Sequence, residues 1–272
     1  MVRVSFQGEP GAYSEEAAIN FFGSNVNLVP LPYLSDVFKS VEKGEVEFAV
    51  VPIENTLEGS VSETYDLLIR TNVKIVGEEI LRIRHCFMAY EGVKIEDIRE
   101  VWSHPQALSQ CRNFIEKMRL KPVPYYDTAG SAKAIAGGKI TYAGAIASCR
   151  AAQHYGLNVL AEGVEDSPNN FTRFIVIGRE PAKEGEREKT SIIFSVNHVP
   201  GALYRALRSF AENNINMTKI ESRPTKERPW EYYFFVDFIG SIEDSNVKKA
   251  LEELKREAVF IKVLGSYPAV SV

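Results

Sequence analysis

Hydrophobic and polar residues follow two periods along the first two thirds of the chain. Val2, Val4 and Phe6 alternate with polar residues, which is the period of a half-buried strand. Other segments repeat apolar residues every three or four positions, as an amphipathic helix does. Strands alternating with helices indicate an α/β domain with a mainly parallel sheet and covering helices. Further strands are expected at 45–51, 73–76, 81–90, 99–102 and 173–178, and helices near 14–23, 34–43, 60–70, 105–118, 128–137 and 144–155.

The hydrophobic run from Leu81 to Phe87 follows a complete set of alternating strands and helices. We interpret this run as the crossing into a second lobe, at about 81–165, and the strand 173–178 as the return. Two α/β lobes joined by crossing segments describe a periplasmic-binding-protein-like architecture, in which a ligand cleft lies between the lobes. Residues 1–180 are therefore expected to form one two-lobed domain.

The C-terminal third is organised differently. Residues 181–189 (PAKEGEREK) are charged, include proline and glycine, and lack apolar periodicity, which is typical of a linker. Beyond the linker, residues 190–272 follow the strand–helix–strand–strand–helix–strand order of a ferredoxin-like domain. The elements expected there are strand 190–197, helix 201–213, strands 215–222 and 230–239, helix 244–257 and strand 259–264.

Length and charge narrow the class of protein. The chain has 272 residues, enough for two domains, and a net charge of −4 with basic and acidic residues interspersed. This balance argues against a nucleic-acid binder. The sequence has neither a long apolar span nor a signal peptide, so no membrane partner is expected. Cys86, Cys111 and Cys149 are widely spaced and suit free thiols. We expect a soluble, cytoplasmic protein.

Polar clusters lie where predicted strands lead into helices, the positions that build ligand crevices in α/β sheets. Residues 8–14 (GEPGAYS) follow the first strand, and Ser14 is expected to cap the next helix. The N–H groups of such a helix start can hold a carboxylate, although a capped helix start alone would also explain this cluster. Residues 52–61 (PIENTLEGSV) gather Glu54 and Asn55 at the end of another strand.

A third cluster is Ser103-His104-Pro105-Gln106. We expect Ser103 to cap a helix and Gln106 to complete a capping box, with proline in the first turn. Capping explains both residues without catalysis, but it leaves His104 unexplained. His104 is therefore either a structural histidine or part of a site.

Several other kinds of site find no support in the sequence. His85 and Cys86 are adjacent in a predicted strand and point to opposite faces, and no paired cysteine or histidine motif is present, so no metal is expected. The sequence contains no Walker loop, no GxGxxG fingerprint and no GxSxG elbow.

These clusters carry a resemblance to the prephenate dehydratase family over essentially the whole chain. GEPGAYS, PIENTLEGSV and SHPQALSQC are followed by YGLNVL (155–160), Asp166 and TRFIVI (172–177). The C-terminal words PGAL (200–203) and TKIESRP (218–224) resemble those of ACT domains. Many relatives carry a chorismate mutase module ahead of the dehydratase. Here the first strand begins at Val2, so that activity is expected to be absent.

The resemblance implies a reaction and its residues. Prephenate, the expected substrate, would lose CO2 and water to give phenylpyruvate, and no cofactor is required. Thr172 is expected to hydrogen-bond the leaving hydroxyl, while His104 and Glu54 are alternatives for the general acid. The expected catalytic residues are Thr172, Glu54, Asn55 and His104. The expected substrate-binding residues are Ser14, Ser103, Gln106, Thr128, Ser131, Ser148, Arg173 and Phe174.

The ACT resemblance implies regulation by L-phenylalanine in a homodimer or tetramer. The expected effector residues are Gly201, Ala202, Leu203, Glu221, Ser222, Arg223 and Pro224. Three alternatives stay open. Arogenate dehydratase shares the chemistry, and a sensor or solute-binding protein would use the cleft without catalysis. A ligand-responsive transcription factor would need a helix-turn-helix or basic patch, which the sequence lacks.

Overall fold

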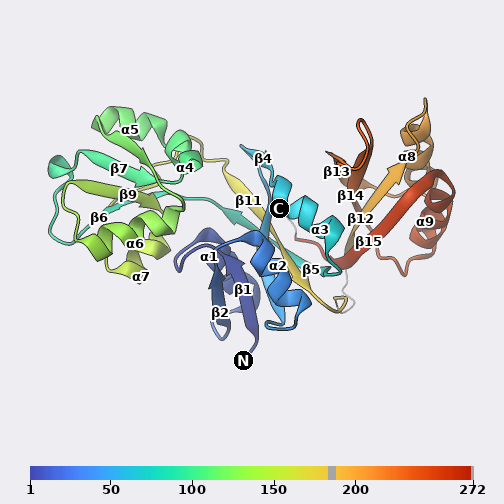
Figure 1. Cartoon of the computed structure of the whole chain (residues 1–272), viewed down its shortest axis with the longest axis horizontal. Helices are drawn as coiled ribbons and strands as arrows, with labels where there is room; N and C mark the ends of the chain where they lie inside the picture. The colour runs from blue at the N-terminus through green and yellow to red at the C-terminus, as the bar shows by residue number, and fades with distance from the viewer. Residues whose placement is uncertain (183–187, 271–272) are drawn as a thin grey trace. The chain divides into compact units, whose positions relative to one another are not determined.

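The computed structural model describes residues 1–182 and 188–270 and divides into two compact units (Figure 1). The N-terminal unit comprises Met1–Ser62 and Glu79–Phe174. The C-terminal unit comprises Glu63–Glu78 and Ile175–Val272. A segment from the middle of the chain, 63–78, therefore belongs with the C-terminal unit, which the sequence pattern did not predict.

The first lobe is built on a six-stranded sheet. Its strand order is β2-β1-β3-β11-β5, with β4 paired to β3, and β1 is parallel to both of its neighbours. Val4 and Phe6 of β1 are fully buried, but so is Ser5 between them, so this part of β1 is buried on both faces and not half-buried as the alternation predicts. The elements of this lobe are β1 (Arg3–Gln7), α1 (Tyr13–Phe22), β2 (Asn27–Leu31), α2 (Leu34–Glu42), β3 (Phe48–Asn55), β4 (Gly59–Ser60), β5 (Lys74–Arg82) and β11 (Phe171–Gly178). Helix α3 (Ser62–Arg70) lies between β4 and β5 in the chain but belongs with the C-terminal unit.

The second lobe has its own five-stranded sheet, in the order β10-β6-β9-β7-β8. Helices α4 and α5 cover one face of it, and α6 and α7 cover the other (Figure 1). The two sheets confirm the predicted two-lobed α/β architecture. The elements are β6 (Cys86–Ala89), the 3₁₀ turn Ile95–Asp97, β7 (Glu100–Ser103), α4 (Pro105–Gln110), α5 (Arg112–Met118), β8 (Lys121–Pro124), α6 (Thr128–Gly138), β9 (Ala143–Ala147), α7 (Cys149–Tyr155) and β10 (Asn158–Glu162).

Three expected elements of this lobe are wrong in detail. The strand expected at 81–90 is two strands, because β5 ends at Arg82 and β6 begins at Cys86. The helix expected at 105–118 breaks at Cys111, where φ is −116° and ψ is 24°. The helix expected at 144–155 is strand β9 followed by α7. The residues of β9 are small and buried on both faces, and such a run lacks the period that separates a strand from a helix.

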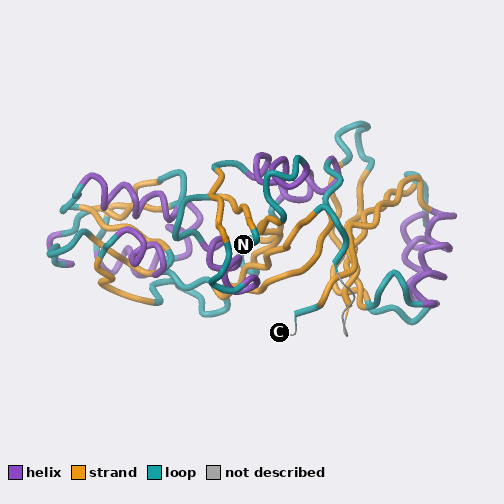
Figure 2. The backbone as a smooth tube through the Cα atoms, turned by 90° about the horizontal axis from the view of Figure 1, so that it is seen from below, coloured by secondary structure: helices purple, strands orange, loops and turns teal. Residues whose placement is uncertain are grey.

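The C-terminal unit contains the predicted ferredoxin-like domain. Its four strands are antiparallel in the order β13-β14-β12-β15, and both helices, α8 and α9, lie on one face (Figure 2). Strand β12 already begins at Glu188, inside the expected linker, and residues 183–187 of that linker lie outside the described residues. The elements are β12 (Glu188–Val196), α8 (Ala202–Glu212), β13 (Met217–Pro224), β14 (Tyr232–Ile239), α9 (Ser245–Glu257) and β15 (Ala258–Pro268).

The face of this sheet opposite α8 and α9 is covered by α3. The Tyr65 ring meets the Phe235 ring edge-on, with centroids 4.6 Å apart. At the other end of α3, Lys262 Nζ donates to the carbonyl oxygens of Leu68 (2.8 Å) and Ile69 (3.2 Å). A cation at a helix C-terminus satisfies carbonyls that have no partner within the helix. Helix α3 is thus an integral part of the C-terminal unit.

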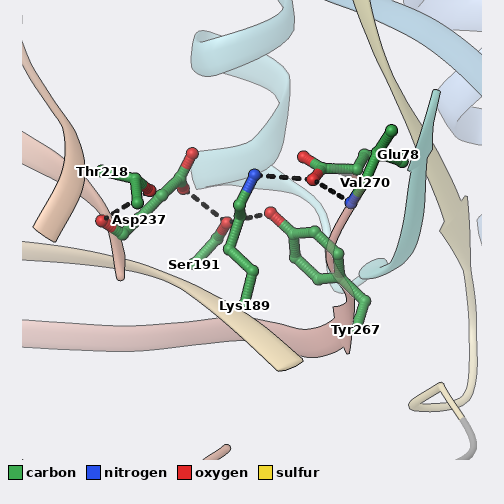
Figure 3. Close-up of polar contacts among 7 residues, drawn as sticks. All are labelled: Glu78, Lys189, Ser191, Thr218, Asp237, Tyr267 and Val270. Carbon is green, nitrogen blue, oxygen red and sulfur yellow. Dashed lines mark hydrogen bonds and ion pairs between the residues drawn. The ribbon is translucent and has the colours of Figure 1, made fainter. Parts of the chain in front are cut away.

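A polar cluster lies buried in the same unit (Figure 3). Ser191 Oγ donates to Asp237 Oδ1 at 2.5 Å and lies 2.7 Å from the Tyr267 hydroxyl. Glu78, whose side chain is fully buried, pairs with Lys189 at 2.6 Å. Glu78 lies in β5 and Lys189 in β12, so this ion pair joins segments far apart in sequence.

Candidate active site

The end of β3 and the start of β11 bring Asn55 and Thr172 together. The two strands are neighbours in the first-lobe sheet. The Asn55 side-chain amide lies 2.9 Å from Thr172 Oγ1. Only 8 % of Asn55 and 9 % of Thr172 are exposed, so the pair lies in a restricted space. The structure therefore joins two residues that the sequence assigned to the same site.

The turn after β3 fixes the orientation of the Asn55 amide. Asn55 Oδ1 accepts hydrogen bonds from the backbone N–H groups of Leu57 (2.9 Å) and Glu58 (3.0 Å), which is an Asx turn. Because backbone N–H groups can only donate, the Asn55 amide nitrogen must be the atom that faces Thr172. Thr172 Oγ1 is thus an acceptor of this bond, and its own hydroxyl hydrogen points elsewhere.

Thr56 ties the same turn to the segment before β11. Its hydroxyl donates to the Asn169 carbonyl at 2.7 Å and accepts from the Phe171 N–H at 2.9 Å. A backbone bond from the Thr56 N–H to the Phe171 carbonyl, 2.9 Å long, completes the junction. The PIENT and TRF words therefore form one structural unit although they are far apart in sequence.

Other expected residues of these strands are placed differently. Glu54 is half-buried in β3 and is paired in register with Ser60 of β4. Arg173 is also half-buried, and it lies on the opposite face of β11 from Thr172 because successive strand side chains alternate. Phe174 shares the face of Thr172 and is only 2 % exposed.

Helix α1 does not begin with the expected serine cap. Its N-cap is Ala12, and no side chain bonds to the first turn from that position, so the prediction for Ser14 is wrong. Ser14 instead lies inside the first turn and is buried. The Glu15 carboxylate accepts the N–H of Gly11 at 2.6 Å, and this bond stabilises the helix start. The GEPGAYS segment therefore presents a helix N-terminus held by a glutamate.

Ser148 joins this segment to the second lobe. It caps α7 by accepting the Ala151 N–H at 3.1 Å, and its own hydroxyl donates to the Gly11 carbonyl at 2.5 Å. A Cβ at Gly11 would lie 2.6 Å from the Ala151 Cα, and the φ of Gly11 is 88°, so only glycine allows this approach. Next to it, Arg150 pairs with Glu15 at 3.0 Å.

The expected capping box at Ser103 is also wrong. The N-cap of α4 is His104, whose Nδ1 accepts the Gln106 N–H at 3.3 Å. Ser103 is instead the last residue of β7, fully buried, and donates to the Ile146 carbonyl at 2.6 Å. The strand continues one residue further than expected, so the cap moves to the histidine. Capping thus gives His104 a structural role, and its imidazole remains half-buried.

The start of α6 holds two further expected residues. Asp127 is the N-cap and accepts the Gly130 N–H at 2.7 Å. Ser131 is fully buried and donates to the Thr128 carbonyl at 2.6 Å, which occupies its hydroxyl hydrogen inside the helix. Burial raises the pKa of the Asp127 carboxyl above its usual range.

Glu9 is a site candidate that the sequence did not single out. It lies in the GEPGAYS segment and accepts hydrogen bonds from Tyr126 (2.8 Å) and Lys133 (2.8 Å) of the second lobe. The bond from Lys133 lowers the pKa of the Glu9 carboxyl, so Glu9 is a carboxylate at neutral pH. The segment is thus linked to the second lobe by this ion pair as well as by Ser148.

Three polar residues behind Asn55 were also missed. Asn170, Gln110 and His85 form successive hydrogen bonds that end at Asn55. A signal for one of them was present, because Gln110 belongs to the SHPQALSQ word that carries the resemblance. His85 lay in a hydrophobic run and showed no partner in sequence, so only the fold could reveal its contacts.

The cysteines differ from the expectation of three free thiols. Cys86 of β6 and Cys149 of α7 form a disulfide, with Cα atoms 5.2 Å apart, so the expectation is wrong for this pair. Strand pairing sets Cys86 opposite Ala147, two residues before Cys149, which explains how residues 63 positions apart meet. Cys111 is free and buried, and burial raises the pKa of its thiol.

Two further observations concern metals and membranes. Among residues 1–182 and 188–270, no group of three or more His, Cys, Asp or Glu side chains is arranged to hold a metal ion. In that same part of the chain, no helix is both long and apolar enough to cross a membrane.

In the C-terminal unit, the PGAL word forms the start of α8. Gly201 is the N-cap with a φ of 79°, a left-handed conformation that suits glycine. Ala202 and Leu203 line a cavity of about 110 Å³ together with His198 and Trp230. The start of α8 and the cavity thus lie together.

The effector residues expected in Glu221–Pro224 are divided between two faces of β13. Ser222 is paired with Phe234, which lines the cavity, so Ser222 lies on that face. Arg223 lies on the other face, 3.8 Å from Asp66 of α3. Glu221 shares the face of Arg223, and Pro224 shares the face of Ser222. Within one subunit, Glu221 and Arg223 therefore point away from the cavity.

The family follows from comparison with known proteins. Residues 4–182 match the family model described as prephenate dehydratase, and residues 190–256 match the ACT domain model. The chain belongs to the prephenate dehydratase family. The matched ranges cover both lobes and most of the ferredoxin-like domain, so family membership rests on the whole fold.

Relatives agree along the whole length. The chain is 47 % identical to "Arogenate dehydratase/prephenate dehydratase 2, chloroplastic" of Arabidopsis thaliana, over 98 % of this chain and 73 % of the relative. It resembles the structure of prephenate dehydratase in complex with L-Phe from Arthrobacter aurescens, with 32 % identity, a TM-score of 0.90 and 100 % and 93 % of the two chains covered. A structure described as GqqA, a novel type of quorum quenching acylase, has 34 % identity, a TM-score of 0.91 and 98 % coverage of each chain.

Proposed function

We propose that this chain converts prephenate into phenylpyruvate, with release of CO2 and water, for L-phenylalanine synthesis. The family match supports the reaction, and the contact between Asn55 and Thr172 carries its assignment to a site. This contact places a hydroxyl, with its oxygen already accepting an N–H, in a nearly buried position at the end of a sheet strand.

The proposed reaction breaks two bonds of prephenate and needs one proton. The electron pair of the bond to the departing carboxylate enters the ring, and the C–O bond of the ring hydroxyl breaks on the opposite side. A proton must reach that leaving oxygen, and the gain of aromaticity supplies much of the driving force. Thr172 donates a hydrogen bond to the leaving oxygen and keeps its proton, and the bond from Asn55 makes Thr172 a better donor. Every atom balances without a redox or group-carrying cofactor.

His104 is the proposed proton source, with Glu54 as the alternative. Nδ1 of His104 accepts a backbone N–H, so in the neutral ring the other nitrogen carries the hydrogen. The substrate carboxylates are proposed to meet the helix starts at Ser14 and Gln106. Arg173 is proposed as a further partner of a carboxylate, and its long side chain would have to reach it around the end of β11. The remaining expected binding residues, Ser103, Thr128, Ser131, Ser148 and Phe174, then shape and support the walls of the site.

Absorbance assays test this function directly. Incubation with prephenate should produce phenylpyruvate with saturation kinetics, whereas a sensor or solute-binding protein would bind prephenate without product. Arogenate should be tested in parallel, because the Arabidopsis relative is named for both activities. Faster turnover of arogenate, with phenylalanine as product, would replace the proposed substrate and keep the chemistry.

L-phenylalanine is proposed as the effector, bound at the PGAL cavity where two ACT domains of a homodimer or tetramer meet. The Arthrobacter relative, whose structure contains L-Phe, supports this proposal. Cooperative inhibition is expected, with about 1–3 kcal/mol of coupling between the effector and substrate sites. Cytoplasmic localisation remains part of the same proposal.

Point variants test the effector site better than truncation, because a chain ending near Ala182 would strip α3 of the sheet that covers Tyr65. Ser222→Ala and Glu221→Ala should each relieve inhibition while basal turnover is kept. Since these residues lie on opposite faces of β13, the larger relief identifies the face that holds the effector. Unchanged inhibition in both variants would place the effector elsewhere.

A further inference from the structure

We propose that His85 is a positioning residue of the reaction, holding the Asn55–Thr172 pair through a chain of carboxamide side chains. The proposal rests on the function proposed above. It concerns a residue outside the substrate site, which acts on Thr172 only through other residues.

The hydrogen-bonded side chains form a continuous chain, and all of them are buried except Gln110, which is half-buried. His85 Nε2 lies 3.0 Å from Gln110 Oε1, and the Asn170 amide nitrogen lies 2.9 Å from the same oxygen. Asn170 Oδ1 in turn lies 2.8 Å from the Asn55 amide nitrogen. The Asn55 amide reaches Thr172 Oγ1 at 2.9 Å. His85 is 2 % exposed and Asn170 is fully buried, so water is largely kept away from these bonds.

The direction of every bond follows from one end. Backbone N–H groups hold Asn55 Oδ1, so the Asn55 nitrogen must donate to Asn170 Oδ1. The Asn170 nitrogen therefore faces Gln110, which must offer its oxygen. That oxygen can only receive a hydrogen from His85, so His85 carries its hydrogen on Nε2. No amide in the chain can be turned over without opposing two donors or two acceptors.

The other side of the His85 ring agrees with this tautomer. With its hydrogen on Nε2, the neutral ring must accept at Nδ1, and the Tyr13 hydroxyl lies 2.7 Å from that nitrogen. Burial raises the pKa of the Tyr13 hydroxyl, so it stays protonated and can donate. Burial also lowers the pKa of His85, which favours the neutral ring. The Glu165 carboxylate accepts the backbone N–H of His85 at 2.9 Å and fixes the main chain there.

The chemistry of carboxamides excludes a proton wire. Asn55, Asn170 and Gln110 do not titrate at accessible pH, so a proton cannot travel from His85 to Thr172. The chain can only transmit orientation. Its effect is to aim the Asn55 N–H at Thr172 Oγ1, so that the Thr172 hydroxyl hydrogen is directed to the leaving oxygen. His85 thus contributes through geometry, as outer-shell residues do for catalytic groups.

A double-mutant cycle on the full-length protein tests this proposal. His85→Leu removes the Nε2 donor and should lower kcat about 10- to 100-fold, with KM changed less than about threefold. His85→Gln places an amide N–H near the Nε2 position and should recover most of that loss. In a Thr172→Ala background, His85→Leu should lower kcat no more than about twofold further, because its effect passes through the missing hydroxyl.

His154→Leu is the matched control, since it makes the same replacement at an exposed histidine of the same unit and should leave kcat unchanged. Full multiplication of the two effects in the cycle would overturn the proposal, because His85 would then act independently of Thr172. Wild-type kcat in His85→Leu would overturn it as well. If His85→Leu fails to fold, Tyr13→Phe enters the same cycle; it removes the hydroxyl that contacts His85 Nδ1 and the Arg84 carbonyl. A wild-type protein that leaves prephenate unchanged would instead refute the proposed function.

Discussion

The two units each bury a polar network, and the networks are built from different chemistry. In the N-terminal unit, neutral side chains run from His85 through Gln110 and Asn170 to Asn55. In the C-terminal unit, a buried ion pair between Glu78 and Lys189 lies in the cluster of Figure 3. Burying a neutral polar group costs little free energy once each polar atom has a hydrogen-bond partner. Burying a charge costs more, because a larger hydration free energy is lost.

The two networks therefore differ in what they contribute: the neutral one orients side chains, and the ion pair holds two segments together. A carboxamide has a donor end and an acceptor end, so a chain of them carries orientation from one residue to the next. An ion pair has little directional information, but removing one partner leaves a buried charge. We therefore expect perturbation of the first network to change turnover, and perturbation of the second to change stability. The four predictions below test this contrast, from the largest expected effect to the smallest.

Breaking the ion pair should have the largest effect. Lys189→Met removes the Lys189 ammonium from beside the fully buried Glu78 carboxylate and should lower the free energy of unfolding by about 3–5 kcal/mol. Adding Glu78→Leu removes the charge and should restore much of the loss. Urea unfolding followed by circular dichroism measures both variants. Equal destabilisation of the single and double variants would show that packing, rather than charge, is responsible.

Removal of the Thr172 hydroxyl comes next. Thr172→Ala should lower turnover at least about 100-fold, or about 2.7 kcal/mol of barrier, while the fold is kept. Thr172→Ser retains a hydroxyl beside Asn55 and should keep much more activity. Steady-state kinetics with prephenate measure the difference. Near-normal turnover of the alanine variant would rule out the assignment of this threonine.

His104 combines a cap with a proposed proton transfer, and two replacements separate them. Asn can cap α4 as His104 does, so His104→Asn should unfold like the wild type, whereas His104→Ala should lose about 1 kcal/mol. Both should change the shape of the pH–rate profile if His104 supplies the proton. A wild-type profile in His104→Asn would leave Glu54 as the proton source.

The smallest effect concerns pH and His85. Its pKa is lowered by burial, so the unfolded chain binds this proton more tightly than the folded protein. The stability contributed by the neutral ring is therefore complete above about pH 6.5 and is lost as pH falls toward the lowered folded pKa, by at most about 1.4 kcal/mol per pH unit. His85→Gln should flatten this slope below about pH 6.5. An unchanged slope would mean that other groups control it.

Sequence alone determined much of this protein. The two-lobed α/β architecture and the ferredoxin-like domain followed from hydrophobic periods, because burial repeats every two residues in a strand and every three or four in a helix. The family followed from short words in fixed order, which also placed Asn55 and Thr172 in one site. Those words mark strand ends and helix starts, where the backbone conformation and the polar side chains are both specified by nearby residues.

Tertiary structure decided what local periods do not encode. The small residues of Ala143–Ala147 form a strand only because neighbouring strands pair with them, and Ser103 lost its expected cap because β7 extends through it. Helix α3 belongs to the C-terminal unit through Tyr65 and Phe235, which are 170 residues apart. His85 gained its partners from α1, from α4 and from the loop before β11. Long-range contacts of this kind depend on the packing of whole elements, so no nearby residue in the sequence predicts them.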